Sequence, residues 1–304
     1  MKIVAKLLVS VLLLCVSLAA QNGSPFVWEG SKGSVRFYLY GTIHLPDPQL
    51  KLPWNVKRLI ARSRGGVYTE VPMTLQTQRS AARAMQRRDT RSLRRLLGDR
   101  LYDRTQNYLK RLDPPVDISR FGGLKVWALA TQLSSLQNQL RYPLLLPLDT
   151  QVYRYAKAKG IHAGGIETVD EQLEIFDRFS LDEQRLMLEG TLDELEKTHD
   201  ASQKLVKLYL DGDAKALRRY FQYTLFHVPR YRQVESVFLE RLLYRRNVRM
   251  AERIEARLRQ CGDAPCFFAF GAMHFLGEKS VIELLKKRGY RIVRIGFTDS
   301  GSRP

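Results

Sequence analysis

The chain has 304 residues, with 50 Lys and Arg against 31 Asp and Glu and a formal net charge of +19. Its hydrophobic share of 44% and charged share of 27% are ordinary for a globular protein, which excludes disordered, collagen-like and coiled-coil classes for the whole chain. The excess of positive charge alone predicts attraction to nucleic acid, a membrane surface or an acidic polymer.

The first twenty residues are typical of a secretory signal peptide. Lys2 and Lys6 precede an apolar run of 14 residues that ends in Ala19 and Ala20, shorter than the roughly 20 residues a membrane-spanning helix needs. We therefore expect residues 1–20 to be removed, leaving residues 21–304 as a single domain, exported to the periplasm or secreted, without a transmembrane segment. Loss of the two lysines lowers the net charge to +17. Export also argues against specific nucleic-acid recognition.

The next predicted elements alternate between strand and helix at both ends of the chain. At the N-terminal end we expect a strand, a helix and a strand over Val35–Tyr40, Trp54–Ser63 and Val67–Val71. The middle is helical over about 74–140 and 168–260, around one short strand at Ile161–Ile166. The C-terminal end repeats strand, helix and strand over Cys266–Phe270, Glu278–Lys287 and Tyr290–Phe297. This order predicts an α/β fold, with α+β as the alternative, whose mixed sheet carries a large helical insertion.

The two ends share a short pattern of four apolar residues, a glycine, two further residues and a histidine. It occurs in Phe37–Leu45 and again in Phe267–Phe275. If the two strands are neighbours in one sheet, His44 and His274 meet at the strands' carboxyl ends, where α/β proteins bind ligands. We expect each glycine to allow a sharp turn that projects the histidine. Two loop histidines bonded to backbone carbonyls are the alternative.

Glu70 places a carboxylate at the same predicted edge, directly after the strand that follows the first motif. Two histidines and one glutamate suit a divalent metal ion with open positions for water, and Mn, Co and Zn are all candidates. The same residues suit a metal-free site in which a base and its orienting partner activate water.

Two further features concern the long helix predicted over about 231–260 and the residues that follow it. Asn247 interrupts an apolar stripe of this helix, so its amide should face inward and need a partner, with Arg246 beside it. Cys261 and Cys266 enclose a turn-forming segment and are the pair left after signal removal, so we expect a disulfide in an oxidising compartment.

Taken together, these motifs resemble the TraB/GumN family, which also includes the TIKI proteases of animals. The matching segments, in order, are Tyr40-Gly-Thr-Ile-His44, Thr69-Glu70, Gly165-Ile-Glu-Thr168 with Glu171-Gln172, Arg246-Asn247 with Met250-Ala251, and Gly271-Ala-Met-His274 with Gly289-Tyr290. The resemblance implies a hydrolase-like fold related to the erythromycin esterases. It implies His44, His274 and Glu70 as site residues, with Arg246, Asn247 and Glu167 in support.

The expected function is an exported, metal-dependent hydrolase of peptide or ester bonds. His44, His274 and Glu70 would hold the ion, and Arg246 or Asn247 would stabilise the developing oxyanion. A metal-free histidine–glutamate esterase is the rival within this class. Outside it, two alternatives are a non-catalytic protein that binds a signalling peptide or haem, and a binder of an anionic polymer or membrane surface.

Overall fold

A computed structural model describes residues 26–197, 201–226 and 228–296, so the predicted signal peptide lies outside the described residues. The centre of the fold is a six-stranded mixed sheet with the strand order β4-β3-β5-β2-β1-β6. Its strands are β1 (Val27–Lys32), β2 (Val35–Thr42), β3 (Gly66–Thr69), β4 (Ala163–Gly165), β5 (Cys266–Gly271) and β6 (Arg291–Arg294). The predicted α/β fold with a mixed sheet is confirmed.

The two motif-bearing strands lie side by side at the middle of the sheet. β2 and β5 pair in parallel, with Phe37 opposite Cys266 and Thr42 opposite Gly271. Each leads through a helix, α2 (Trp54–Arg62) or α14 (Val281–Lys287), to a return strand, β3 or β6. The two return strands lie on opposite sides of the central pair.

Strand β1 was not predicted. It pairs antiparallel with β2 on one side and β6 on the other. Gly30 and Ser31 give it a weak strand propensity, so its conformation depends on having a partner on each side.

The helices form two insertions. The first, between β3 and β4, contains α3 (Leu75–Met85), α4 (Leu93–Leu97), α5 (Asp99–Lys110), the 3₁₀ turn η1 (Ile118–Phe121), α6 (Val126–Arg141) and α7 (Leu148–Ala158). The second, between β4 and β5, contains α8 (Val169–Asp177), α9 (Leu181–Lys197), α10 (Ala201–Leu210), α11 (Ala214–Phe226), the 3₁₀ turn η2 (Pro229–Tyr231), α12 (Arg232–Leu239), η3 (Glu240–Tyr244) and α13 (Arg245–Cys261).

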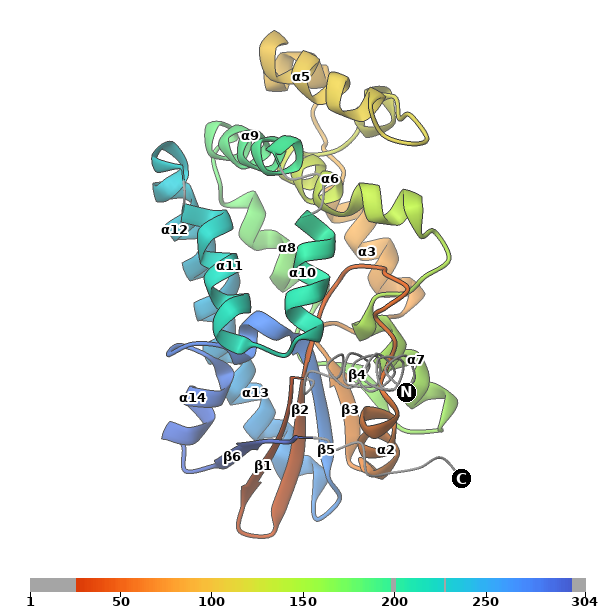
Figure 1. Ribbon diagram of the computed structural model, residues 1–304, viewed down its shortest axis with the longest axis vertical. Coiled ribbons are helices and arrows are strands. Elements are labelled where there is room, and N and C mark those ends of the chain that lie inside the picture. The colour runs from red at the N-terminus through yellow and green to blue at the C-terminus, as the bar shows by residue number, and fades with distance from the viewer. Residues whose placement is uncertain (1–25, 198–200, 227, 297–304) are drawn as a thin grey trace, which may run out of the picture.

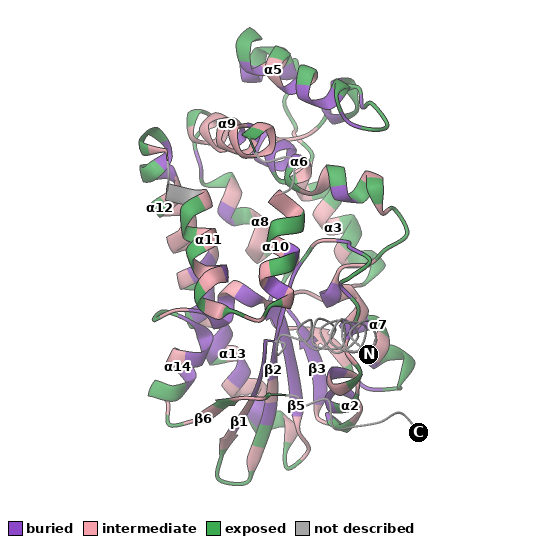
Figure 2. Cartoon of the chain, viewed as in Figure 1, coloured by how far each residue is buried: buried purple, intermediate pink, exposed green. Residues whose placement is uncertain are grey.

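The helical insertions build a second apolar core away from the sheet. α2 and α7 lie on one side of the sheet and α13 and α14 on the other, while α5, α6 and α9 stand at the far end of the molecule (Figure 1). The central strands β2, β3 and β5 are largely buried, whereas α5 is mostly exposed on its outer side (Figure 2). Leucines of α4, α5, α6 and α9 make the second core, among them Leu96, Leu109, Leu133 and Leu188.

The predicted long helix contains a π-helical segment. Its backbone is helical from α12 to α13, but η3 has the wider π-helical turn, which holds one more residue than an α-turn and is frequent at functional sites. The predicted inward stripe is confirmed, because Leu243, Asn247, Met250, Ile254 and Leu258 are all buried.

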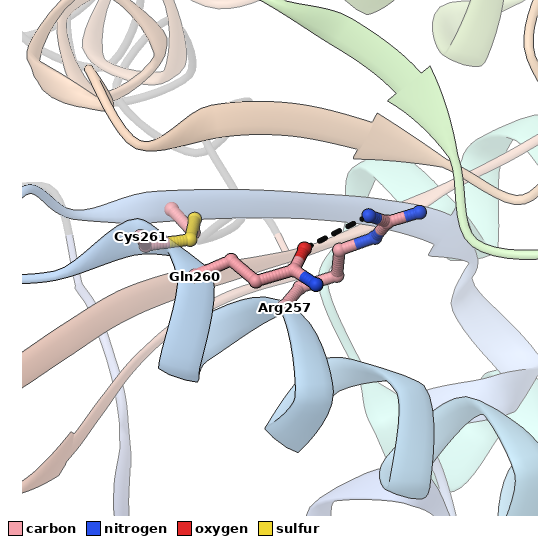
Figure 3. The surroundings of a disulfide bond; sticks show 4 residues. Arg257, Gln260 and Cys261 are labelled. Atoms are coloured by element: carbon pink, nitrogen blue, oxygen red, sulfur yellow. Dashed lines mark hydrogen bonds between the residues drawn. A yellow bond between two sulfur atoms is a disulfide. The ribbon is translucent and has the colours of Figure 1, made fainter.

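The predicted disulfide between Cys261 and Cys266 is present and joins the end of α13 to the start of β5 (Figure 3). Across the described residues, no helix combines the length and the apolar character that crossing a membrane requires.

Candidate active site

Three parallel strands deliver His44, Glu70 and His274 to one edge of the sheet. Glu70 directly follows β3, and His44 follows β2 by two residues. His274 lies in η4 (Ala272–Phe275), the 3₁₀ turn that directly follows β5. Because β2, β5 and β3 are adjacent and parallel, their carboxyl ends meet at this edge.

The two histidines face the same oxygen of Glu70. The Nε2 atoms of His44 and His274 lie 3.4 Å and 3.7 Å from Glu70 Oε1. The backbone N–H of Gly271 donates a hydrogen bond to that oxygen, with an N···O distance of 2.7 Å. Residues 230 positions apart in the chain therefore contact one carboxylate.

The motif glycines serve a different purpose from the sharp turn that we expected. Gly41 and Gly271 lie within strands, and neither has a positive φ. Instead, a Cβ atom at Gly271 would lie 3.1 Å from His44 Nε2 and 3.3 Å from Glu70 Oε1. A Cβ atom at Gly41 would lie 2.9 Å from Phe26 Cβ. The glycines allow close packing around the site.

His274 is buried and held in one tautomer. Asn247 Nδ2 donates to the carbonyl of Lys279, which turns its Oδ1 toward His274 Nδ1 at 2.6 Å. Because Oδ1 only accepts, Nδ1 carries the proton and Nε2 keeps a free lone pair. Burial lowers the pKa of His274 to about 3, so the ring is neutral near pH 7.

His44 lies at the open side of the site, with 54% of its side chain exposed. Its Nδ1 is 3.3 Å from Asp149 Oδ2, so a carboxylate flanks each ring nitrogen. Partial loss of hydration among these neighbours opposes protonation, but Asp149 and Glu70 together raise the pKa of His44 well above its ordinary value.

Asp149 was not predicted as a site residue, although its position in the sequence pattern indicated a buried carboxylate. It lies in the first turn of α7, on the stripe formed with Val152, Tyr153 and Ala156, all of which are buried. A carboxylate on an apolar stripe is the same kind of interruption that marked Asn247.

The second oxygen of Glu70 belongs to a buried charge network. Glu70 Oε2 accepts from Arg246 Nη2 at 2.5 Å and from Gln172 Nε2 at 3.1 Å. Arg246 also pairs with Glu167, whose carboxylate is fully buried. Burial alone would raise the pKa of Glu70, but the Arg246 guanidinium, together with His44, holds it well below its ordinary value. Glu70 is therefore ionised.

Arg246 and Asn247 have other partners than the oxyanion that we expected. The guanidinium donates to Glu70, Glu167 and the carbonyl of Leu242, and the Asn247 amide donates to Lys279. Their donors are thus engaged in fixing Glu70 and His274. Gln172, which bridges Glu70 and Glu167, was present in the motif pattern but had no assigned role.

Comparison with known sequences assigns the chain to a family. A sequence model described as the TraB/PrgY/gumN family matches residues 26–294. The chain belongs to the TraB/PrgY/gumN family. No solved structure matches it.

Curated relatives of this TraB/PrgY/gumN protein are named metalloproteases. Metalloprotease TIKI2 of Xenopus tropicalis is 28% identical over 300 residues, covering 84% of this chain and 57% of the relative. A TIKI homolog of Amphimedon queenslandica is 27% identical over 97% of this chain and 68% of its own length. Metalloprotease TIKI1 of Danio rerio is 27% identical, over 88% and 63%. The chain spans about three fifths of the length of these relatives.

The donor chemistry of this TraB/PrgY/gumN site suits a divalent metal. Two imidazole nitrogens face one carboxylate oxygen, and the other nitrogen of each ring lies against Asp149 or Asn247, as is usual for metal-binding histidines. The separations of 3.4 and 3.7 Å are near the spacing of two ligands that are each about 2.1 Å from one ion. As they stand, however, no three His, Cys, Asp or Glu side chains among the described residues are arranged to hold an ion.

Proposed function

We propose that this protein is a metal-dependent hydrolase that cleaves peptide bonds, with His44, Glu70 and His274 as the metal ligands. The observation that carries the proposal is the approach of the Nε2 atoms of His44 and His274 to Glu70 Oε1. The naming of its relatives as metalloproteases supports a peptide rather than an ester substrate. A bound ion would supply a Lewis acid and a water molecule that is acidic near neutral pH.

The surrounding side chains prepare these three residues. Asn247 keeps the proton of His274 on Nδ1, so its Nε2 lone pair faces the site. Asp149 orients His44 through Nδ1, and Arg246 keeps Glu70 ionised. Glu167 balances the charge of Arg246, which leaves Glu70 free to attract a cation with its other oxygen.

A metal-free mechanism is the second candidate, because His44 lies between two carboxylates. In that mechanism the paired His44 and Glu70 would move the proton of a water molecule that attacks the substrate carbonyl. The two mechanisms differ in what a chelator does to turnover.

We also propose that the protein acts outside the cytoplasm, as a single domain after removal of residues 1–20. The charged and apolar pattern of these residues supports export. Comparison of the N-terminal residue of the exported protein with Gln21 would test the cleavage position.

Metal content measured by mass spectrometry in the purified protein tests the metal ligands. We expect about one ion per chain in the wild type, loss of the ion in His44→Ala and His274→Ala, and retention in His162→Ala, which removes an exposed histidine. Unchanged metal in both site variants would rule out the assignment.

Turnover is measured on a mixed peptide library by detecting new amino termini. Loss of cleavage on chelation and recovery with added Mn, Co or Zn is the expected result. Cleavage that resists chelation but disappears in Glu70→Gln would favour the metal-free mechanism. Peptide binding without any product would favour a non-catalytic binding protein.

A further inference from the structure

We propose that the free edge of β4 receives the substrate as an extended peptide strand, and that a cleft beside this edge takes an acidic side chain of that peptide. This inference rests on the proposed peptide hydrolysis and specifies its substrate.

The outer side of β4 has unpaired backbone groups. β4 pairs with β3, and no other described strand lies beyond it. Val67 N–H donates to His162 O at 2.8 Å and Ile166 N–H donates to Thr69 O at 2.9 Å, so residues 162 and 166 face β3. Because backbone groups alternate in direction along a strand, those of Ala163 and Gly165 face outward. Such an edge binds an extended peptide by main-chain hydrogen bonds.

A cleft of about 420 Å³ opens beside this edge. Its lining includes Gly165, the start of α8 at Thr168, and Arg253, Arg257 and Gln260 of α13. Its volume lies in the usual range for ligand sites, about 300–1,000 Å³. Because Gly165 belongs both to the cleft and to the outward-facing edge, a peptide paired with β4 would have a side chain within reach of the cleft.

The charge of the cleft favours an acidic side chain. Its two carboxylates are already neutralised, Glu167 by Arg246 and Glu171 by Arg253. The hydrogen bonds from Arg253 lower the pKa of Glu171 to about 2, so this carboxylate stays charged and paired.

Arg257 is the remaining cationic side chain of the cleft. Its guanidinium lies 5.2 Å from the centre of the Tyr68 ring. It also donates to Gln260 Oε1 at 3.0 Å (Figure 3). Among the described residues no carboxylate pairs with it. A carboxylate of the peptide would therefore be its first charged partner.

The edge leads directly to the candidate active site. The N–H groups of Ile166 and Glu167 donate to the carbonyl of Glu70 at 3.1 and 2.8 Å. A peptide that leaves this edge and crosses the carboxyl ends of β4 and β3 would cover two strand spacings, about 10 Å, to reach the strand that carries Glu70. About three extended residues, at about 3.3 Å each, cover that distance. We therefore expect the acidic residue three to five positions from the cleaved bond.

The first test sequences the products from a library of end-blocked decapeptides with randomised positions. We expect the wild type to select Asp or Glu three to five residues from the cleaved bond. Arg257→Glu should lower cleavage of these acidic peptides about tenfold. Arg259→Glu is the matched control, because it makes the same charge change at an exposed position of α13 that does not line the cleft. Cleavage without an acidic preference, or with a preference that Arg257→Glu leaves unchanged, would overturn the proposal.

The second test measures binding and needs no turnover. Fluorescence anisotropy compares a labelled decapeptide of alternating Thr and Glu with two versions that are N-methylated on alternate residues. We expect the unmodified peptide to bind the wild type and to bind Arg257→Glu about tenfold more weakly, and one methylated version to lose binding. Equal binding of all three peptides would mean that charge alone attracts them and would overturn strand pairing.

The two tests separate the inference from the function on which it rests. The expected binding pattern without cleavage of any library peptide would count against hydrolysis and support docking at β4. Neither binding nor cleavage would overturn both.

Discussion

His274 Nδ1 lies 2.6 Å from Asn247 Oδ1, and this contact joins the turn after β5 to helix α13 inside the protein. Both side chains are buried, and the second hydrogen bond of Asn247, to the carbonyl of Lys279, fixes which end of the amide faces the ring. One residue thus determines both the orientation and the tautomer of a candidate metal ligand.

Replacing Asn247 with alanine should destabilise the fold. Asn247→Ala leaves the buried Nδ1 of His274 without its partner and removes the hydrogen bond to the carbonyl of Lys279, so we expect the free energy of unfolding to fall by about 1–3 kcal/mol. Urea denaturation measures the loss. Asn138→Ala is the control, because this buried asparagine makes a single long bond of 3.4 Å to Pro46 O. An equal cost in both variants would contradict the assigned role.

The two motif glycines should respond differently to alanine. Gly271→Ala places a methyl group against His44 and Glu70, so hydrolysis should fall at least about tenfold. In Gly41→Ala, the methyl meets Phe26 and the backbone of Ala272, so the main loss should be stability, of about 1–3 kcal/mol. Parallel measurements of turnover and thermal unfolding separate these effects.

Gly190→Ala is the control for both variants. Gly190 lies in α9, and an added Cβ would make only ordinary contacts with the Tyr231 ring, at 3.6 Å or more. It should raise the free energy of unfolding by up to about 1 kcal/mol. Full activity in Gly271→Ala would contradict the close packing assigned to this glycine.

Arg246 should be essential for stability because it neutralises two buried carboxylates. The Glu70 and Glu167 side chains are 12% and 0% exposed, so Arg246→Met leaves uncompensated charge and should cost about 3–5 kcal/mol. Adding Glu167→Gln should recover part of the loss. Arg94→Met, which also removes a guanidinium bridging two carboxylates but at the surface, should have little effect on chemical denaturation.

The buried neutral His274 predicts a loss of stability in acid. Its pKa is about 3 in the folded protein and about 6.5 in an unfolded chain, so below pH 6.5 only the unfolded chain takes up the proton. The free energy of unfolding of the metal-free protein should therefore fall by about 1.4 kcal/mol per pH unit between pH 6.5 and 3 from this residue.

The comparison that isolates this effect is a pair of variants. His274→Asn should reduce the slope of unfolding free energy against pH in this range by about one proton. His162→Asn, at an exposed histidine outside the candidate site, is the control for the loss of an imidazole. A wild-type slope in His274→Asn would show that His274 does not titrate as described.

The site residues were predictable from the sequence where they follow the end of a strand. The apolar runs of β2 and β5 predict buried neighbouring strands. The motif residues that follow these strands then meet at one edge of the sheet, independently of how the intervening helices pack. Asn247 was recognisable because a polar residue on an apolar stripe requires a buried partner.

Features that depend on distant neighbours could not be predicted in this way. Which helix presents Asp149 to His44 depends on how α7 docks, and local periodicity carries no information on docking. The role of Gly271 depends on side chains that approach from two other strands. The contact of Arg246 with Glu70 depends on the register of α13, and the π-helical turn before it changes that register.

The parallel pairing of β2 with β5 determines when the site can form. During synthesis, His44 emerges long before His274, and the two are brought together only when β5 inserts between β2 and β3. A partly synthesised chain therefore carries an incomplete site, and a proteolytic fragment that lacks either end does too. Any hydrolytic activity is thus coupled to completion of the fold.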